Sequence, residues 1–199
     1  MGLATVVDLR SAGELAAQPN PFRRDPRVTY HNVPLFHGLS PIEMLDPDGA
    51  PFDMANRYCR GFDQCQARFA EAVRAIVTAP PGGVLFHCSA GKDRTGLVAA
   101  LILSVAGVPE AEILEDYAMT ETVARPLLAM LREGALGRGT DPNLVDSTLA
   151  SRPMTMRRAL DHLHGVYGGP EAYMRAIGLD DGEVASLRDR LLSGARMSA

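Results

Sequence analysis

The sequence predicts an α/β fold with a helix-rich C-terminal half, because strand-like runs occur in its first half and helical segments fill most of its second half. Short runs of β-branched and other apolar residues occur at 5–9, 28–35 and 84–86, and such runs favour β-strands. From residue 95 onward the chain consists mainly of segments with helical character, separated by Gly and Pro. The 199 residues are 46% hydrophobic, which fits one domain over residues 1–199.

The segments between the predicted strands are assigned by their turn residues and their apolar spacing. Residues 20–26 and 38–52 are rich in Pro, Asp and Gly, which predicts surface loops. Residues 58–78 carry apolar side chains mainly three and four positions apart, so they are predicted to form one amphipathic helix that stops at the turn 80–83. The other predicted helices are 95–105, 110–122, a following segment to 132, 154–167, 171–177 and 181–192.

Composition excludes several classes of function. Lys and Arg total 20 against 24 Asp and Glu, and the net charge of -4 gives no general attraction for nucleic acid or an anionic membrane. The apolar run 97–108 is too short to span a bilayer, so no integral membrane segment is predicted. Three cysteines form neither an even disulfide framework nor a zinc pattern. A cytoplasmic location is therefore expected, with signal-independent secretion left open.

One segment carries a pattern with chemical meaning. Residues 87–96 read His-Cys-Ser-Ala-Gly-Lys-Asp-Arg-Thr-Gly, directly after a predicted strand and at the start of a predicted helix. Backbone N–H groups in such a loop can surround one phosphate, and the helix N-terminus adds partial positive charge. Gly91 permits a turn that a side chain would hinder. The residues predicted to surround the phosphate are Ser89, Ala90, Gly91, Lys92, Asp93 and Arg94.

The side chains of this loop suit phosphoryl transfer. The same positive field favours the thiolate of Cys88, which makes that residue the predicted nucleophile. Arg94 can fold back and bind two phosphate oxygens with its planar fork, which a lysine cannot copy. The Thr95 hydroxyl can donate to the departing sulfur, and His87 is expected to orient the loop. A purely structural thiol is the weaker interpretation, because these residue types stand at fixed offsets in a strand, loop and helix.

The loop closely resembles the signature of the cysteine-dependent CX5R phosphatases. Its Gly-Lys-Asp-Arg-Thr form is similar to that of bacterial tyrosine and dual-specificity phosphatases of the protein-tyrosine-phosphatase-B type, some of which also accept phosphoinositides. The resemblance covers most of the chain. Further similar segments are residues 8–11 with Glu14, 56–58, 107–109, 116–117, Tyr173 and 187–188.

This resemblance implies a cysteine-phosphatase-like fold, with a central, largely parallel sheet flanked by helices. It implies a two-step reaction without metal or cofactor, in which phospho-Cys88 forms and water then releases inorganic phosphate. The implied substrates are a phosphorylated protein or a phosphoinositide. Lys92 and Asp93 are the loop pair that distinguishes this subgroup, and Lys92 is interpreted as a cation for a second phosphate.

Two segments depart from the family pattern. Family members usually carry a further stretch before the strand at 5–9, so the N-terminal edge of the domain is expected to be truncated or the start assigned late. Residues 133–152 correspond to a region that family members can use as a helical lid. In this chain the segment is rich in Gly and polar residues, and a lid and an open loop are both compatible with it.

The general acid is assigned to Asp93, with Asp53 as its competitor. Asp93 lies inside the reactive loop and needs no loop closure to approach the leaving group, whereas Asp53 would have to be carried in on a mobile segment. Asp46, Asp48 and Asp63 are weaker versions of the second choice.

Other residues are given structural interpretations. Arg10 and Glu14 are expected to brace the first strand through ion pairs, and Cys59 and Cys65 are expected to be packing residues. The basic cluster of Arg23, Arg24 and Arg27 is interpreted as a solvated face. The alternative functions are a rhodanese-like sulfurtransferase, an arsenate reductase, or a noncatalytic phosphate-binding module.

Overall fold

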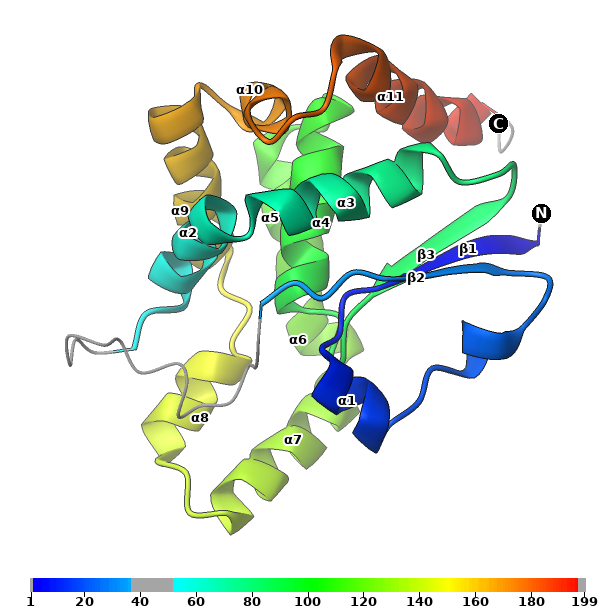
Figure 1. Ribbon diagram of the computed structural model, residues 1–199. Helices are drawn as coiled ribbons and strands as arrows, with labels where there is room; N and C mark the ends of the chain where they lie inside the picture. Colours follow the sequence, from blue (N-terminus) through cyan, green and yellow to red (C-terminus); the bar gives the residue numbers. More distant parts are fainter. Residues whose placement is uncertain (1, 37–51, 197–199) are drawn as a thin grey trace.

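Three parallel strands form the sheet of the described chain, which the computed structural model covers at residues 2–36 and 52–196. They are β1 (Leu3–Asp8), β2 (Thr29–Asn32) and β3 (Gly83–His87), in the spatial order β2-β1-β3 (Figure 1). β1 pairs in parallel with both neighbours, which confirms the predicted parallel sheet. The carboxyl ends of all three strands therefore share one edge, where α/β proteins place their ligands.

The central strand is apolar because helices cover the sheet. Val6 and Val7 of β1 are fully buried, and Thr5 is buried with them. Parallel sheets with covered faces have such continuous apolar strands rather than alternating ones. The predicted second strand is shorter than expected, since only Thr29–Asn32 pairs with β1 before the chain reaches Pro34.

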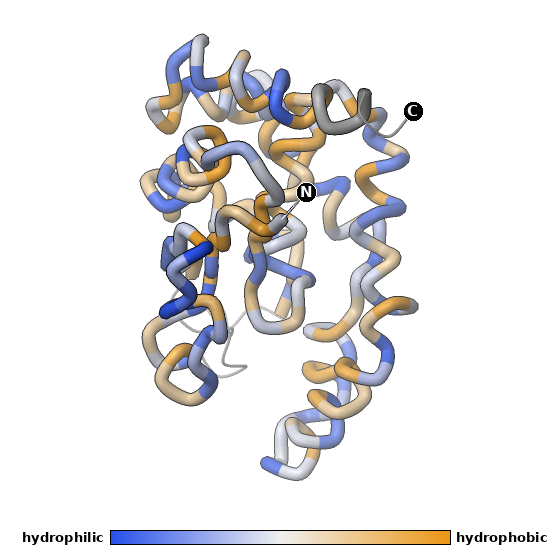
Figure 2. Tube along the Cα trace, turned by 90° about the vertical axis from the view of Figure 1, so that its right-hand side faces the viewer, coloured by the Kyte–Doolittle hydropathy of each residue, from blue (hydrophilic) through white to orange (hydrophobic). Residues whose placement is uncertain are grey.

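Helices make up most of the remaining chain, and the outer ones alternate hydrophilic and hydrophobic stretches (Figure 2). The predicted helix-rich C-terminal half is confirmed. The helices are α1 (Ala12–Ala17), α2 (Met54–Gln64), α3 (Gln66–Val77), α4 (Asp93–Val105), α5 (Glu110–Ala118), α6 (Thr120–Val123), α7 (Arg125–Gly137), α8 (Pro142–Leu149), α9 (Pro153–His162), α10 (Pro170–Ala176) and α11 (Asp181–Arg196), with a 3-10 helix, η1 (Pro21–Arg24), and a π-helix, η2 (Leu163–Tyr167).

The prediction of one helix over 58–78 was wrong, because the chain forms α2 and α3 with a break at Cys65. The backbone of Cys65 has φ -111° and ψ 24°, outside the helical range. The Phe62 and Phe69 ring centroids lie 5.0 Å apart, whereas seven residues of straight helix rise about 10.5 Å. The break therefore lets both rings pack in one core. α2 also begins earlier than predicted, because the Asp53 carboxylate caps its first turn.

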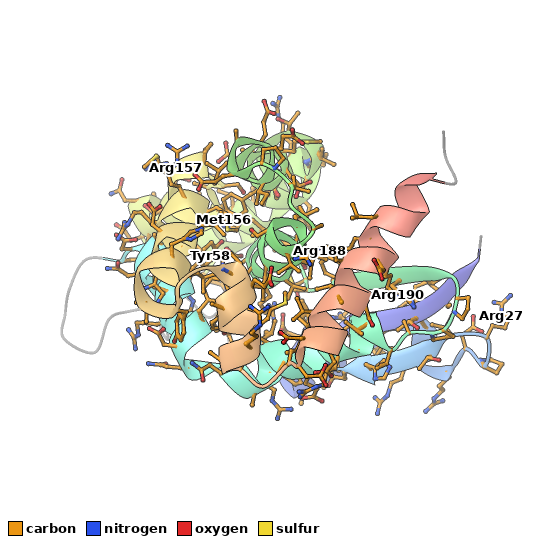
Figure 3. The ribbon with its side chains drawn as sticks, turned by 90° about the horizontal axis from the view of Figure 1, so that it is seen from above. Arg27, Tyr58, Met156, Arg157, Arg188 and Arg190 are labelled. Carbon is orange, nitrogen blue, oxygen red and sulfur yellow. The ribbon has the colours of Figure 1, made fainter. Side chains whose placement is uncertain are left out.

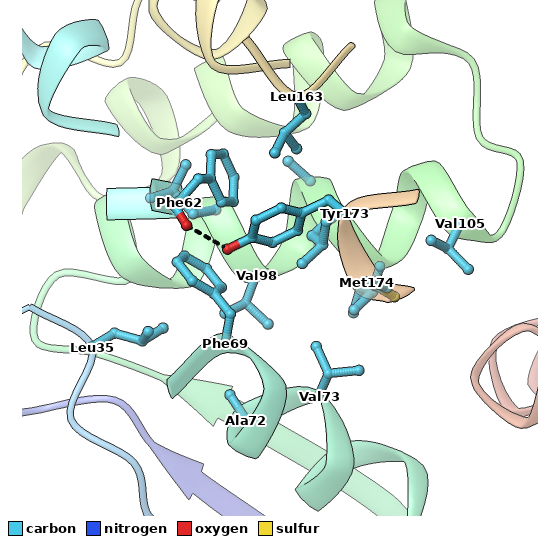
Figure 4. Close-up of a cluster of buried hydrophobic side chains, with 14 of the residues drawn as sticks. Leu35, Phe62, Phe69, Ala72, Val73, Val98, Val105, Leu163, Tyr173 and Met174 are labelled. Atoms are coloured by element: carbon cyan, nitrogen blue, oxygen red, sulfur yellow. Dashed lines mark hydrogen bonds between the residues drawn. The ribbon is translucent and has the colours of Figure 1, made fainter. Parts of the chain in front are cut away.

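The core lies between the central helix α4 and the helices around it. Tyr173 packs edge-on against Phe62 at 5.3 Å, and its hydroxyl donates to the Phe62 carbonyl at 2.8 Å (Figure 4). Tyr58 and Met156 lie inside the helical layer, whereas Arg157 points outward (Figure 3). This core holds α4, and with α4 the end of the reactive loop, in one position relative to the sheet.

Most of the segment 133–152 is helical. It contains the end of α7 and all of α8, and the two helices form an arm at the bottom of Figure 1. The α8 helix begins at Pro142 because Asp141 accepts hydrogen bonds from the N–H groups of Asn143 and Leu144. An open loop is therefore the wrong description of this segment.

Candidate active site

The reactive loop connects β3 to α4 at the carboxyl edge of the sheet. β3 ends at His87, and α4 begins at Asp93 without a side-chain cap, which leaves N–H groups of its first turn available. Gly91 has a φ of 72°, in the left-handed region that favours glycine. Cys88 is 5% exposed, at the base of the loop. The predicted strand, loop and helix are thus all present.

Arg94 is held in place by Glu14. Its Nη1 and Nη2 donate to the two Glu14 carboxylate oxygens, each at 2.7 Å, and Nη1 also donates to the Leu9 carbonyl at 3.3 Å. The Arg94 side chain is 2% exposed, yet its Nε has no partner within the described residues. Glu14 therefore occupies the end of the guanidinium and leaves Nε, on the adjacent edge, without a hydrogen-bond partner among the described residues.

Glu14 reaches the loop from α1, and its contact with Arg94 is the main feature of the site that was not predicted from the sequence. It also accepts a hydrogen bond from the Ser89 hydroxyl at 2.5 Å and one from the Ser11 N–H at 2.8 Å. Burial would raise its pKa, but the bonds from Arg94 and Ser89 hold the pKa of Glu14 well below its ordinary value. Arg10 pairs with Asp8 at the end of β1 at 2.7 Å, as expected of a residue that braces the first strand. Glu14 was expected to do the same, but it pairs with Arg94 of the reactive loop, so that expectation was wrong for Glu14.

A pocket of about 240 Å³ opens over this loop, and the arm forms its other wall. From the loop and α1 it is lined by Glu14, Cys88, Ser89, Ala90, Lys92, Asp93 and Arg94. From α7, α8 and the turn between them it is lined by Leu128, Leu131, Ala135, Arg138, Val145, Thr148 and Leu149. Gly91 and Thr95 are not among the lining residues, although both were predicted site residues. The Thr95 hydroxyl is buried and has no partner within the described residues.

Lys92 joins the loop to the arm. Its ammonium donates to the carbonyls of Thr148 and, at 3.1 Å, Ala150, and it lies 3.2 Å from Asp93 Oδ1. The side chain is 2% exposed. Lys92 lines the pocket, but its charge is engaged by groups of the protein, which argues against a free cation waiting for a second phosphate.

Asp93 shares a buried hydrogen-bonded chain with two tyrosines. The Tyr58 hydroxyl donates to Asp93 Oδ1 at 2.6 Å, and the Tyr58 and Tyr117 hydroxyl oxygens are 2.9 Å apart. Burial raises the pKa of Tyr58 well above its ordinary value, so this hydroxyl remains a proton donor to Asp93. Tyr58 and Lys92 both approach the same carboxylate oxygen, Oδ1.

Asp53 lies elsewhere, where it caps α2 and pairs with Arg158 at 2.7 Å. Burial would raise its pKa, but Arg158 and the backbone N–H groups of Ala55 and Asn56 lower the pKa of Asp53. It lines a separate pocket with Arg152 and Arg158. Asp63 contacts His162 and Tyr167 on the outer side of α2. Asp46 and Asp48 fall outside the described residues.

The described ranges, 2–36 and 52–196, contain neither a candidate metal-binding cluster nor a candidate membrane span. In them no group of three or more His, Cys, Asp or Glu side chains is placed to hold a metal ion. No helix there combines the length and the apolar composition needed to cross a bilayer.

The chain is similar to known phosphatases over almost its whole length. It is 32% identical to a tyrosine-protein phosphatase of Nostoc commune over 202 aligned positions, which cover 96% of this chain and 67% of that protein. It is 28% identical to a triple specificity protein phosphatase of Mycobacterium tuberculosis, with 96% of this chain and 83% of that protein covered. The profile of the tyrosine phosphatase family matches residues 1–193, from the sheet through the pocket walls to α11. This chain therefore belongs to the tyrosine phosphatase family.

Proposed function

We propose that this phosphatase works through a phosphocysteine intermediate formed on Cys88. The observation that carries the proposal is the free edge of Arg94, a buried fork of N–H donors fixed by Glu14 at the loop that contains the thiol. Two phosphate oxygens can accept from Nε and Nη2, while loop N–H groups bind the third. The site then stabilises the charge that the transferring phosphoryl group spreads over its oxygens.

The proposed reaction has two steps. The Cys88 thiolate attacks phosphorus, the bond from phosphorus to the leaving oxygen breaks, and Asp93 gives that oxygen a proton. Water then attacks phospho-Cys88, Asp93 takes the water's proton, and the thiolate leaves as inorganic phosphate forms. The Thr95 hydroxyl, which has no partner among the residues that the structure describes, can stabilise the departing sulfur. No metal takes part in this scheme, so EDTA should leave turnover unchanged.

A simple aryl phosphate assay tests the reaction class. Phosphate release should exceed any turnover of thiosulfate or arsenate by the same preparation. A larger rate with thiosulfate would favour a sulfurtransferase, and a larger rate with arsenate would favour a reductase. Binding of phosphate without turnover would indicate a noncatalytic module.

The structure favours Asp93 over Asp53 as the general acid. Asp93 lines the Cys88 pocket, and its Oδ1 receives Tyr58 and Lys92, which leaves Oδ2 to carry the transferred proton. Asp53 is tied to Arg158 and to the first turn of α2, so it would have to break these bonds before reaching the substrate.

Asp93→Asn should therefore slow substrates with poor leaving groups by roughly 10²- to 10⁴-fold and substrates with good leaving groups much less. The asparagine keeps an Oδ1 that can accept from Tyr58, so packing is retained while the proton is lost. The measurement is kcat across aryl phosphates of graded leaving-group pKa. Asp53→Asn is the matched control. A steep leaving-group dependence in the Asp53 variant, with uniform slowing in the Asp93 variant, would reverse the assignment.

Phosphotyrosine in proteins is the substrate that the pocket suits best. The wall opposite Cys88 consists mostly of apolar side chains, including Leu128, Leu131 and Leu149, which can pack against a phenyl ring. Phosphoinositides are proposed as a second substrate class because an exposed arginine, Arg138, lines the same pocket and can bind a further phosphate. The cytoplasmic location predicted from the sequence also stays a proposal.

Arg138→Ala should reduce hydrolysis of a phosphoinositide about tenfold, because a charge-assisted hydrogen bond to a second phosphate is lost. Hydrolysis of an aryl phosphate should change less than twofold. Arg132→Ala is the control, since Arg132 is also on α7 but pairs with Asp146 at 2.7 Å. Equal losses on both substrates in the Arg138 variant, or no lipid hydrolysis by the wild type, would contradict the second substrate class.

A further inference from the structure

A buried polar cluster lies at the carboxyl edge of the sheet, outside the pocket lining. Asp8 at the end of β1 is fully buried, and Asn20, just before η1, is 5% exposed. His87 at the end of β3 completes the cluster, because its Nε2 lies 2.9 Å from Asn20 Nδ2. Its other ring nitrogen, Nδ1, lies 2.8 Å from the carbonyl oxygen of Cys88. A chain of contacts thus leads from Asp8 to the backbone of the nucleophile.

The orientation of the Asn20 amide follows from its neighbours. Its Oδ1 accepts a hydrogen bond from the Phe22 N–H at 2.9 Å, so Nδ2 is the atom that faces Asp8 and His87. Nδ2 donates to Asp8 Oδ2 at 2.7 Å. Burial would raise the pKa of Asp8, but hydrogen bonds from Arg10 and Asn20 lower it to about 2, so Asp8 is a charged acceptor. One Nδ2 hydrogen goes to Asp8, and the second is directed at His87.

The protonation of His87 follows in turn. Because Asn20 donates to Nε2, Nε2 must accept, and the single ring proton is on Nδ1. Nδ1–H then donates to the Cys88 carbonyl. A peptide unit is planar and trans, so holding that carbonyl on the His87 side turns the Ser89 N–H to the opposite side. Ser89 is one of the residues that line the pocket.

We propose that Asn20 is a positioning residue for the reaction, which fixes His87 as its neutral Nδ1–H tautomer and thereby fixes the peptide between Cys88 and Ser89. This inference rests on the proposed role of Cys88. Asn20 is not among the residues that line the pocket. It acts through the imidazole, which keeps a carbonyl oxygen away from the bound phosphate and an N–H available to it.

Removing the Asn20 donor changes the hydrogen bonds that the His87 ring can form and therefore its protonation. The charged and titratable groups of the cluster are Asp8, Arg10 and Tyr30 from the β1 and β2 side, with Cys88 on the other side of the ring. His87 Nε2 lies 3.6 Å from Asp8 Oδ2. Without the amide, a proton on Nε2 gains a carboxylate partner. The ring then either becomes the Nε2–H tautomer, whose Nδ1 cannot donate to Cys88, or becomes a cation.

The test compares Asn20→Ser and Asn20→Asp with the wild type. Serine keeps an oxygen for the Phe22 N–H but has no amide donor, and aspartate keeps the shape while its carboxyl, at hydrogen-bond distance from Asp8, shares a proton with Asp8 and directs none to His87. In the wild type, the ¹⁵N signals of the His87 ring should report the Nδ1–H tautomer. In both variants they should report Nε2–H or the cation. In a variant whose ring is Nε2–H, vanadate affinity and the rate of Cys88 alkylation should each fall about tenfold, whereas a cationic ring keeps its Nδ1–H donor and should leave both near the wild type.

Asn32→Ser is the matched control. Asn32 Nδ2 donates to the carbonyls of Asp8 and Arg10 at 3.0 and 2.9 Å, so it supports the same end of β1 without reaching His87. This variant should lower Tm but leave the ring tautomer and the vanadate affinity unchanged. If the Asn20 variants lower Tm and likewise leave both unchanged, Asn20 is purely structural and the proposal fails.

Two further outcomes are decisive. An Nε2–H tautomer in the wild type would overturn the proposal without any variant, so the test does not depend on how well the variants fold. Turnover by a Cys88→Ser variant would refute the proposed role of Cys88 instead. In that case the tautomer measurement would still decide the link between Asn20 and His87.

Discussion

Replacing Cys88 with serine should reduce turnover by roughly 10⁴-fold or more, while vanadate and phosphate still bind. The serine hydroxyl is not ionised at neutral pH and is a far weaker nucleophile. The rest of the anion site persists, because Arg94 is held by Glu14 and the loop backbone is set by β3 and α4. The measurements are kcat on an aryl phosphate and the dissociation constant of vanadate.

Cys59→Ser is the control for this experiment. Cys59 is on α2 and its thiol contacts the Arg158 carbonyl at 3.8 Å, away from the pocket over the reactive loop. Its loss should leave kcat unchanged. Residual activity of the Cys88 variant within tenfold of the wild type would refute a cysteinyl-phosphate mechanism.

Arg94→Lys should reduce kcat/KM by roughly 10³-fold, because at least one directed donor to the transition state is lost. Lysine cannot donate to both Glu14 oxygens and also present an edge to two phosphate oxygens. The variant also leaves the partly buried Glu14 carboxylate with fewer partners, so vanadate affinity should fall as well. The measurements are kcat, KM and the vanadate dissociation constant on one preparation.

Glu14→Gln separates the binding of phosphate by Arg94 from the positioning of Arg94 by the Glu14 carboxylate. Arg94 keeps its charge and its free edge but loses the carboxylate that holds it, so this variant should lose less activity than Arg94→Lys. Arg158→Lys, at the exposed pair with Asp53, is the control for a general effect of replacing an arginine. If the kcat/KM of Arg94→Lys stays within tenfold of the wild-type value, the planar guanidinium of Arg94 is not needed for the reaction.

The reactive loop could be predicted because its parts are adjacent in sequence. Residues 87–96 contain the strand end, the glycine turn and the start of the helix, so spacing alone indicates the arrangement. The partners of these residues are distant. Glu14 is 80 positions before Arg94, and Tyr58 is 35 positions before Asp93. No local pattern connects such pairs. The capping box of Ser11 and Glu14 marks a helix start, but not the arginine that Glu14 also binds.

The errors in predicting the fold from the sequence have different causes. The break at Cys65 depends on how Phe62 and Phe69 pack with Tyr173, which lies more than a hundred positions further along. The α8 helix is eight residues long and begins with a capped proline inside a Gly- and polar-rich segment, so its apolar pattern was too short to recognise. The break is decided by tertiary contacts, whereas the start of α8 has a local signal in Asp141 and Pro142 that the polar character of the segment obscured.

The pairing of Arg94 with Glu14 has a consequence for how the enzyme selects its ligand. The pocket lining contains the cations Arg94, Lys92 and Arg138 and the acids Glu14 and Asp93. The positive and negative charges nearly cancel, so a dianion gains little from net charge. Affinity must come from the directions of the N–H groups, which match three oxygens arranged around phosphorus. A planar carboxylate carries the same sign of charge but cannot fill that arrangement, so the many acidic side chains of protein substrates should not compete for the site.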